Sequence, residues 1–214
     1  MTQTVEGTRA KREVEVRRAR PSEIGLVVDV LTRAFDDDPL TNWAVAQDKK
    51  RTERMRRFFD APVRSMAMRH DAIYTTPDLE GVAAWVPPGK FKLGLLDQAR
   101  QLPEMVRCTT LRRFPSVMRA FNKVESKHPK KPHWYLMAVG VEPELQGRSI
   151  GSQLLAPVLE RCDAEHVGAY LESSKERNLP LYERLGFRVT DEFEVADGAP
   201  RIWLMWREPV RSAQ

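Results

Sequence analysis

Two short stretches of this chain combine residue types that suit the chemistry of phosphates and thioesters. Residues 146–151 read Gln-Gly-Arg-Ser-Ile-Gly and begin an amphipathic helix directly after an apolar strand. Backbone N–H groups left free at a helix start, beside small residues that admit a ligand closely, form a cradle for an anion. Residues 178–187 place Asn178 one helical turn before Tyr182 and end in Gly-Phe. A phenol at Tyr182 could protonate a departing thiolate.

Two other phosphate motifs compete for the first stretch. A P-loop needs Gly-Lys-Ser/Thr, but Gly151 is followed by Ser152 and Gln153. A dinucleotide-binding Rossmann turn needs G-x-G-x-x-G, whereas here only Gly147 and Gly151 occur, four residues apart. Glu172 does lie about twenty residues further on at a strand end, where that fold keeps its ribose-binding acid. The Rossmann alternative is therefore weakened and not excluded by this segment.

An amine that attacks a thioester must first lose a proton, so a carboxylate base is expected near the cradle. Glu142 and Glu144 follow the strand before the cradle, and Glu172 ends the neighbouring strand. We favour Glu172, because a strand end beside the strand that carries the cradle would face the cleft. The run 36–38 of three aspartates would either attract a cationic acceptor or stop the preceding helix with turn chemistry.

Hydrophobic periodicity predicts the elements that must position these residues. The expected strands cover 14–17, 72–75, 81–86, 134–141, 169–172, 187–195 and 201–206, and the expected helices cover 21–35, 49–69, 90–131 (interrupted by prolines), 149–165 and 176–185. Gly186 is the expected C-cap of the last helix. Strands that alternate with helices in the second half predict an α/β fold with a mixed sheet.

Composition sets the broad class. The 214 residues are 42% apolar and 30% charged, which suits one globular domain. The net charge of +5 favours polyanionic partners, either a nucleic acid or a small phosphorylated cofactor. The basic run 49–57 is expected to be the solvated face of a helix, so no nucleic-acid partner is predicted. The four histidines, His70, His128, His133 and His166, lack the spacing of metal ligands, so no metal is predicted.

The chain ends and the cysteines bear on location. Residues 1–12 are predicted to be a disordered tail before a single domain that covers 13–208. No secretory signal and no membrane-spanning run is recognisable, so we expect a cytoplasmic protein without a membrane partner. Cys108 and Cys162 are too few for a disulfide framework, and Cys162 falls on the apolar side of a predicted helix. The oligomeric state stays open, a homodimer included.

The cradle, followed about thirty residues later by Asn-x-x-x-Tyr and Gly-Phe, resembles the GNAT superfamily of acetyl-CoA-dependent N-acetyltransferases. The signature of that family is Gln/Arg-x-x-Gly-x-Gly/Ala, and Ser149 stands where the family usually has glycine. A serine there either tightens the approach of a pyrophosphate or is harmless if it keeps helical dihedrals. Within the superfamily, residues 129–136, 139–141, 171–174 and 178–187 are similar to the puromycin N-acetyltransferase group.

The resemblance implies a GNAT fold, with a central mixed sheet flanked by helices, splayed at strand 134–141 beyond Val139-Gly140-Val141. Acetyl-CoA would lie in the splay, and the helical insertion 90–131 would cover the acceptor site. The implied catalytic residues are Tyr182 as general acid and Val141, whose N–H would polarise the thioester carbonyl. The implied cofactor-binding residues are Val139, Val141, Gln146, Gly147, Arg148, Ser149, Ile150, Gly151, Ser152, Asn178 and Tyr182.

The expected activity is transfer of an acetyl group from acetyl-CoA to a primary amine of a small molecule, such as an antibiotic-like acceptor. Attack would be direct in a ternary complex, without an acyl-enzyme, and Glu172 is the preferred base. The alternative is an acyl-CoA-binding regulatory protein that has the fold but little turnover. Ser149 in the cradle is the feature that favours this alternative.

Overall fold

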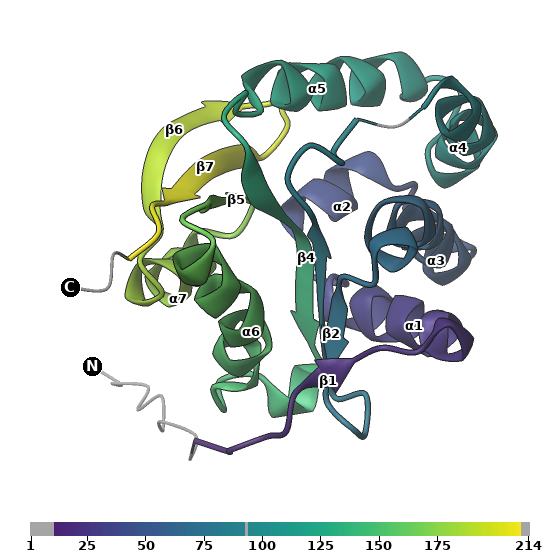
Figure 1. The fold of residues 1–214 in the computed structure, drawn as a ribbon. Coiled ribbons are helices and arrows are strands. Elements are labelled where there is room, and N and C mark those ends of the chain that lie inside the picture. Colours follow the sequence, from purple (N-terminus) through teal and green to yellow (C-terminus); the bar gives the residue numbers. More distant parts are fainter. Residues whose placement is uncertain (1–10, 93, 211–214) are drawn as a thin grey trace, which may run out of the picture.

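The computed structural model describes residues 11–92 and 94–210, in which a mixed sheet lies between layers of helices (Figure 1). The α-helices are α1 (Ile24–Ala34), α2 (Pro39–Ala44), α3 (Arg51–Pro62), α4 (Leu95–Cys108), α5 (Phe114–Lys127), α6 (Ile150–Ala164) and α7 (Leu179–Arg184). The strands are β1 (Arg17–Arg18), β2 (Ile73–Thr75), β3 (Gly81–Val86), β4 (His133–Val141), β5 (Gly168–Ser173), β6 (Arg188–Glu194) and β7 (Arg201–Arg207). Shorter turns are the 3₁₀ segments Pro21–Glu23, Met68–His70, Pro143–Leu145 and Glu176–Asn178, and a π-helical turn at Val63–Ala67.

The described strands form one seven-stranded sheet in the order β1-β2-β3-β4-β5-β7-β6. Among them β4 and β5 pair in parallel, and every other adjacent pair is antiparallel. The predicted mixed α/β fold is confirmed. The hairpin of β2 and β3 and the closing pair β6 and β7 also lie where the sequence pattern predicted them.

Helices cover both faces of the sheet because each face carries its own apolar cluster. On one face α6 buries the stripe that its spacing predicts, which consists of Ile150, Leu154, Leu155, Val158, Leu159 and Cys162. On the other face α1 and α3 pack over the half formed by β2, β3 and β4. Over the second half of that face, Ala120 of α5 packs against Tyr170 of β5 (Figure 1).

The insertion 90–131 divides into two helices with different neighbours. Helix α4 packs against α3, where Arg57 pairs with Glu104 at 3.0 Å. Helix α5 crosses the face of the sheet near β5, and its C-cap residue, His128, reaches towards Glu172 at the end of that strand. Of the two helices in the insertion, α5 is therefore the one that ends close to Glu172.

A buried arginine in β7 binds this strand to helices α6 and α7. Arg207 of β7 donates through both terminal nitrogens to Asp163 at the end of α6, at 2.7 and 2.8 Å. Its Nε donates to the carbonyl of Leu185, at 2.8 Å, just after α7. Its alkyl stem lies beside Gly186, which adopts the left-handed conformation with φ of +90°. The C-cap of α7 is Leu185, so Gly186, which was predicted to be the cap, stands one position after it. The contact with Arg207 holds α7, and therefore Tyr182, against the sheet.

Candidate functional site

Strands β4 and β5 part in the middle of the sheet. Their last residue pair is Leu136 with Leu171, although β4 continues to Val141. The divergence therefore begins at Met137, earlier than the predicted point beyond Val139-Gly140-Val141. Met137 is also the extra residue of a β-bulge, because Ala84 and Trp85 of β3 pair with Ala138 and Leu136. A bulge bends and twists a strand, which gives a local cause for the early divergence.

The hydrogen-bond pattern shows which way the free half of β4 directs its backbone. The N–H of Glu142 donates to the carbonyl of Glu80 at 2.9 Å, so residue 142 faces β3. Successive residues of a strand direct their N–H and C=O groups to opposite sides. Val141 and Val139 therefore turn these groups away from β3 and into the gap. The carbonyl of Val141 accepts a bond there from Gln146 Nε2, at 3.1 Å.

The start of α6 presents N–H groups to the same gap. Its first helical bond runs from Gln153 N to Ser149 O at 3.3 Å, so the N–H groups of residues 150–152 precede the hydrogen-bond ladder. Gly151 adds space, because a Cβ there would meet nothing closer than 3.8 Å. Free amides at the positive end of a helix dipole form the predicted anion cradle.

Ser149 is the N-cap of α6 in the left-handed region, with φ of +66° and ψ of 10°. Ser149 therefore does not keep the right-handed helical dihedrals that were the condition for a harmless substitution. It adopts the conformation that glycine favours, and Gly147, with φ of +80°, does the same two residues earlier. Serine thus keeps the path of the glycine-containing turn and accepts backbone strain for it.

We expect Ser149→Gly to stabilise the protein by about 1 kcal/mol, because glycine adopts a positive φ without a Cβ clash. The measurement is the free energy of unfolding in urea. Ser126→Gly is the matched control, since Ser126 is exposed in the right-handed helix α5 and glycine there should destabilise by about 0.5–1 kcal/mol. If both variants lose stability alike, Ser149 is not strained.

The N-terminal segment is part of this site, which the sequence did not predict. The side chain of Gln153 donates to the carbonyl of Arg12 at 2.7 Å and accepts from the N–H of Val14 at 2.9 Å. The N–H of Arg12 donates to the carbonyl of Arg148 at 3.0 Å. Residues 11 and 12, assigned from the sequence to a disordered tail, are therefore fixed along the start of α6. The expected strand at 14–17 is reduced to β1, at 17–18.

A cleft of about 1150 Å³ occupies the gap between β4 and β5 and extends from the start of α6 to α7. It is lined by most of the predicted cofactor-binding residues, namely Val139, Val141, Gln146, Gly147, Ser149, Ile150, Gly151, Ser152, Asn178 and Tyr182. Arg148 is the predicted residue that does not line it. The cationic side chain of Lys11 does line the cleft.

Comparison with known proteins agrees with this geometry. The acetyltransferase (GNAT) family model matches residues 82–187. A Schizosaccharomyces pombe protein described as an uncharacterised N-acetyltransferase is 25% identical over 205 residues, which are 90% of this chain and 83% of that protein. A Corynebacterium glutamicum crystal structure, described as histone acetyltransferase HPA2 and related acetyltransferase, is 25% identical with a TM-score of 0.70 over 95% of this chain and 100% of that one. The chain belongs to the GNAT superfamily of acetyltransferases.

A more distant GNAT structure shares the fold. The polyamine N-acetyltransferase of Drosophila melanogaster, an enzyme that forms N-acetylagmatine, is 16% identical with a TM-score of 0.62. The match covers 92% of this chain and 100% of that one. At this identity the likeness concerns the arrangement of strands and helices.

Tyr182 lies in α7 at the wall of the GNAT cleft, 6% exposed and packed edge-on against Phe187 with ring centroids 6.1 Å apart. Burial, and then the negative charge of Asp38, raise the pKa of this phenol well above its ordinary value. The hydroxyl therefore keeps its proton at neutral pH. That is the state a proton donor needs.

The three candidate carboxylates differ in whether they line the cleft. Glu172 lines the cleft at the end of β5, one residue beyond the last pair with β4. Glu142 instead forms a two-pronged ion pair with Arg33, with oxygens at 2.6 and 2.9 Å from its nitrogens. Neither Glu142 nor Glu144 is among the described residues that line the cleft. The sequence-based preference for Glu172 as the carboxylate nearest the gap agrees with this placement.

The aspartate run 36–38 joins the two loops that border the cleft. Asp38 caps α2 by accepting from Thr41 N at 2.9 Å, and it also accepts from Ser174 Oγ. Asp37 pairs with Lys175 and Arg177. Burial acts to raise the pKa of Asp37, but the two cations outweigh it and hold this pKa below its ordinary value. Turn chemistry and pairing between the two loops thus account for the three aspartates. The short helix α2, which Asp38 caps, was not predicted from the sequence.

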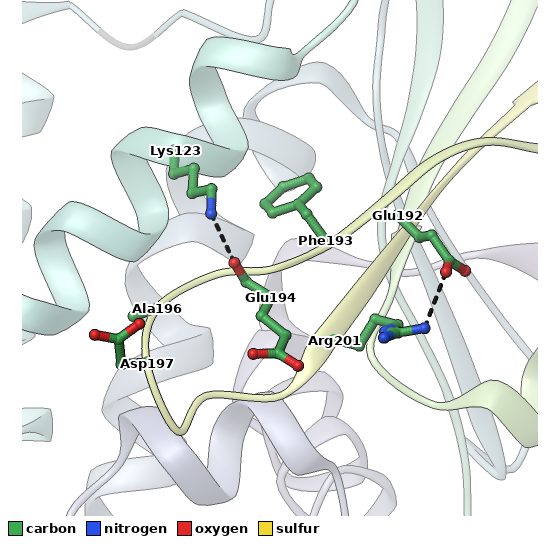
Figure 2. A pocket seen from close by; sticks show the side chains of 7 residues that line it. All are labelled: Lys123, Glu192, Phe193, Glu194, Ala196, Asp197 and Arg201. Carbon is green, nitrogen blue, oxygen red and sulfur yellow. Dashed lines mark hydrogen bonds and ion pairs between the residues drawn. The ribbon is translucent and has the colours of Figure 1, made fainter.

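A second hollow, of about 460 Å³, lies between α5 and the hairpin of β6 and β7 (Figure 2). Lys123 reaches from α5 to the carbonyl of Glu194 at 2.7 Å, and Arg201 pairs with Glu192 at 2.9 Å. Both cations of this hollow therefore bind partners within the protein.

The part of the chain that the structure describes contains no helix long and apolar enough to cross a membrane. Both cysteines, Cys108 and Cys162, are free and buried, and burial raises the pKa of each thiol to about 12. They are core residues, as the helix pattern predicted for Cys162.

Proposed function

We propose that this GNAT protein transfers an acetyl group from acetyl-CoA to a primary amine of a small molecule, by direct attack in a ternary complex. The observation that carries the proposal is the continuous cleft from the free amides of residues 150–152, along the unpaired backbone of β4, to the protonated phenol of Tyr182. Anion cradle, strand edge and proton donor all line this one cleft, and CoA carries the three matching parts, which are a diphosphate, an amide-containing arm and a thiol.

The residues present fit this donor. The amides of residues 150–152 suit a diphosphate, because they are unpaired N–H donors at a helix start. The outward N–H and C=O groups of Val139 and the outward N–H of Val141 suit an arm that contains amides, as one strand suits another. The carbonyl of Val141 is taken by Gln146. Asn178 also lines the cleft. When bound, acetyl-CoA supplies the activated acyl group.

Each proposed catalytic residue has a defined task. The N–H of Val141 donates to the acyl oxygen, where negative charge develops during attack. Tyr182 gives its proton to the departing sulfur. Glu172 takes the proton of the incoming ammonium. Direct attack is supported by the state of the thiols, because Cys108 and Cys162 are 1% and 0% exposed and are protonated at neutral pH.

The proposal includes no nucleic-acid partner, and charge pairing in the basic segment supports this. In the basic segment of α3, Arg54 pairs with Asp48, Arg56 with Asp29, and Arg57 with Glu53 and Glu104. Arginines that are neutralised within the protein release few counterions from a polyanion. This agrees with the solvated-face interpretation of residues 49–57.

The decisive experiment measures release of free thiol from acetyl-CoA with a panel of amines, together with binding of acetyl-CoA by calorimetry. The panel contains agmatine, spermidine, an arylalkylamine, an aminonucleoside antibiotic and a lysine-containing peptide. Amine-dependent thiol release with a small molecule supports the proposal. Binding without release would favour the alternative, an acyl-CoA-binding regulator. Absence of binding at millimolar acetyl-CoA and low salt would refute both.

Lys11 provides a test of the cofactor end of the cleft. We expect Lys11→Ala to raise KM for acetyl-CoA about threefold to fivefold with kcat unchanged, because it removes an exposed cation that faces an anionic ligand. The defect should shrink as salt is added, since salt screens such pairs. Lys130→Ala, an exposed lysine outside the cleft, is the control. An equal KM for wild type and Lys11→Ala at low salt would remove Lys11 from the site.

A further inference from the structure

A buried chain of titratable groups lies behind Glu172, and the proposed reaction does not yet use it. Nδ1 of His128 lies 3.7 Å from Oε1 of Glu172, and the two side chains are 7% and 13% exposed. Nε2 of His128 lies 3.0 Å from Nε2 of His133. Nδ1 of His133 lies 2.7 Å from the carbonyl oxygen of Lys131. The chain thus runs from the cleft to the linker before β4.

The positions of the protons follow from which atoms can accept. The carbonyl of Lys131 only accepts, so Nδ1 of His133 carries a proton. Burial lowers the pKa of His133, so this ring is neutral at neutral pH and its Nε2 is an acceptor. His128 therefore donates through Nε2. In the neutral form of this ring Nδ1 is bare, and this nitrogen is buried without a hydrogen-bond partner among the described residues.

The bare Nδ1 of His128 and the Glu172 carboxylate face each other across 3.7 Å. Both are proton acceptors, so the pair can take up one proton. The groups around them hold this pair in position. The ring of Phe91 stacks on His128 with centroids 3.6 Å apart and an interplanar angle of 7°. The phenols of Tyr135 and Tyr170 stand edge-on to the same ring.

The charges that face this pair are few. Burial, and then the charge of Glu172, raise the pKa of both Tyr135 and Tyr170, so these phenols stay protonated. The titratable groups that face His128 are Tyr135 and His133 of β4 and Tyr170 of β5. Within residues 11–92 and 94–210, His128 is the basic side chain that lies within 4 Å of the Glu172 carboxylate.

We propose that His128 is the positioning partner of Glu172 and the place where the acceptor's proton is held during acetyl transfer. An N–H bond of the acceptor ammonium breaks, its electron pair stays on nitrogen, and the proton passes through the Glu172 carboxylate to Nδ1 of His128. The result is an imidazolium beside a carboxylate, with His133 keeping the ring in the required tautomer. This inference rests on the proposed acetyltransferase function, and it adds a residue from the insertion 90–131 to the proton path.

The first test is the pH dependence of kcat/KM for one amine in wild type and in His128→Phe. Phenylalanine keeps the stacking on Phe91 but removes both ring nitrogens. We expect the acid limb of the profile to move at least about one pH unit lower, because the carboxylate alone then accepts the proton, and the plateau to fall about tenfold to hundredfold. His166→Asn, at an exposed histidine outside the cleft, should keep the wild-type profile. An unmoved acid limb in His128→Phe overturns the inference, even if the plateau falls.

The second test needs no turnover. Nitrogen NMR of the histidine rings should show neutral His128 as the Nε2–H tautomer, and Glu172→Gln should lower the pH midpoint at which this ring takes up a proton. An Nδ1–H tautomer, or a midpoint that Glu172→Gln leaves unchanged, overturns the inference. If no amine is acetylated, the proposed function fails while the NMR result still decides whether Glu172 and His128 share a proton.

Discussion

Tyr182→Phe should lower kcat about 100-fold while the dissociation constant for acetyl-CoA stays within about twofold. The substitution removes one oxygen from the cleft wall and keeps the ring that packs against Phe187. The hydroxyl retains its proton because burial raises its pKa, so it can serve as donor to the departing sulfur but adds little to binding before that step. Steady-state thiol release gives kcat, and calorimetry gives the affinity.

Tyr74→Phe is the matched control for this prediction. Tyr74 is a second buried tyrosine, 8% exposed in β2 and outside the cleft, so its variant should keep kcat. Equal turnover by Tyr182→Phe and wild type would remove Tyr182 from the acid role. A parallel loss in kcat and affinity would assign it to cofactor binding instead.

Asp163→Ala should destabilise the protein by about 3–5 kcal/mol, because it leaves the guanidinium of Arg207 buried without its anionic partner. Arg207 is 6% exposed, and both terminal nitrogens donate to this carboxylate. Asp163 also accepts from Val210 N at 2.7 Å, so the end of the chain loses an anchor too. Unfolding in urea measures the change. Glu208→Ala, which breaks the exposed pair with Lys131, should cost well under 1 kcal/mol.

The same carboxylate gives a pH signature. Arg207 first, and then the Val210 amide, hold the pKa of Asp163 below its ordinary value, against the opposite effect of burial. A carboxyl group with a lowered folded-state pKa contributes stability above its unfolded value, about 4, and loses it as the pH falls from there through the folded value. The stability difference between wild type and Asp163→Ala should therefore shrink on acidification in that window. A constant difference would contradict the assignment.

The sequence predicted the parts of the site that depend on local pattern. The apolar strand before Gln146, the glycines of the cradle, and the spacing of Asn178 and Tyr182 each follow from neighbours in the chain. These signals located β4, α6 and α7 and, through them, most of the cleft. Glu172 followed from the expectation that adjacent strand ends face one gap.

The remaining parts depend on tertiary contacts. The divergence at Met137 comes from a bulge that only pairing with β3 reveals. The contact of the chain near Lys11 with α6 depends on Gln153, a residue with no local signal for that role. The approach of His128 to Glu172 joins residues 44 positions apart (172 minus 128). The sequence signal for this contact is a pair of histidines that flank a proline-containing linker, and such a pair without metal-ligand spacing predicts no site by itself.

The parting of β4 from β5 creates an unusual kind of edge strand. An edge is normally at the perimeter of a sheet, where its unpaired groups invite the strands of other proteins. This edge is recessed between the two halves of one sheet, so a second polypeptide with its own sheet cannot reach it. A thin, flexible molecule of about one strand's width can. On a strand at the perimeter, such unpaired backbone groups would allow aggregation with other proteins. In the recess between β4 and β5 they are accessible only to a narrow linear ligand.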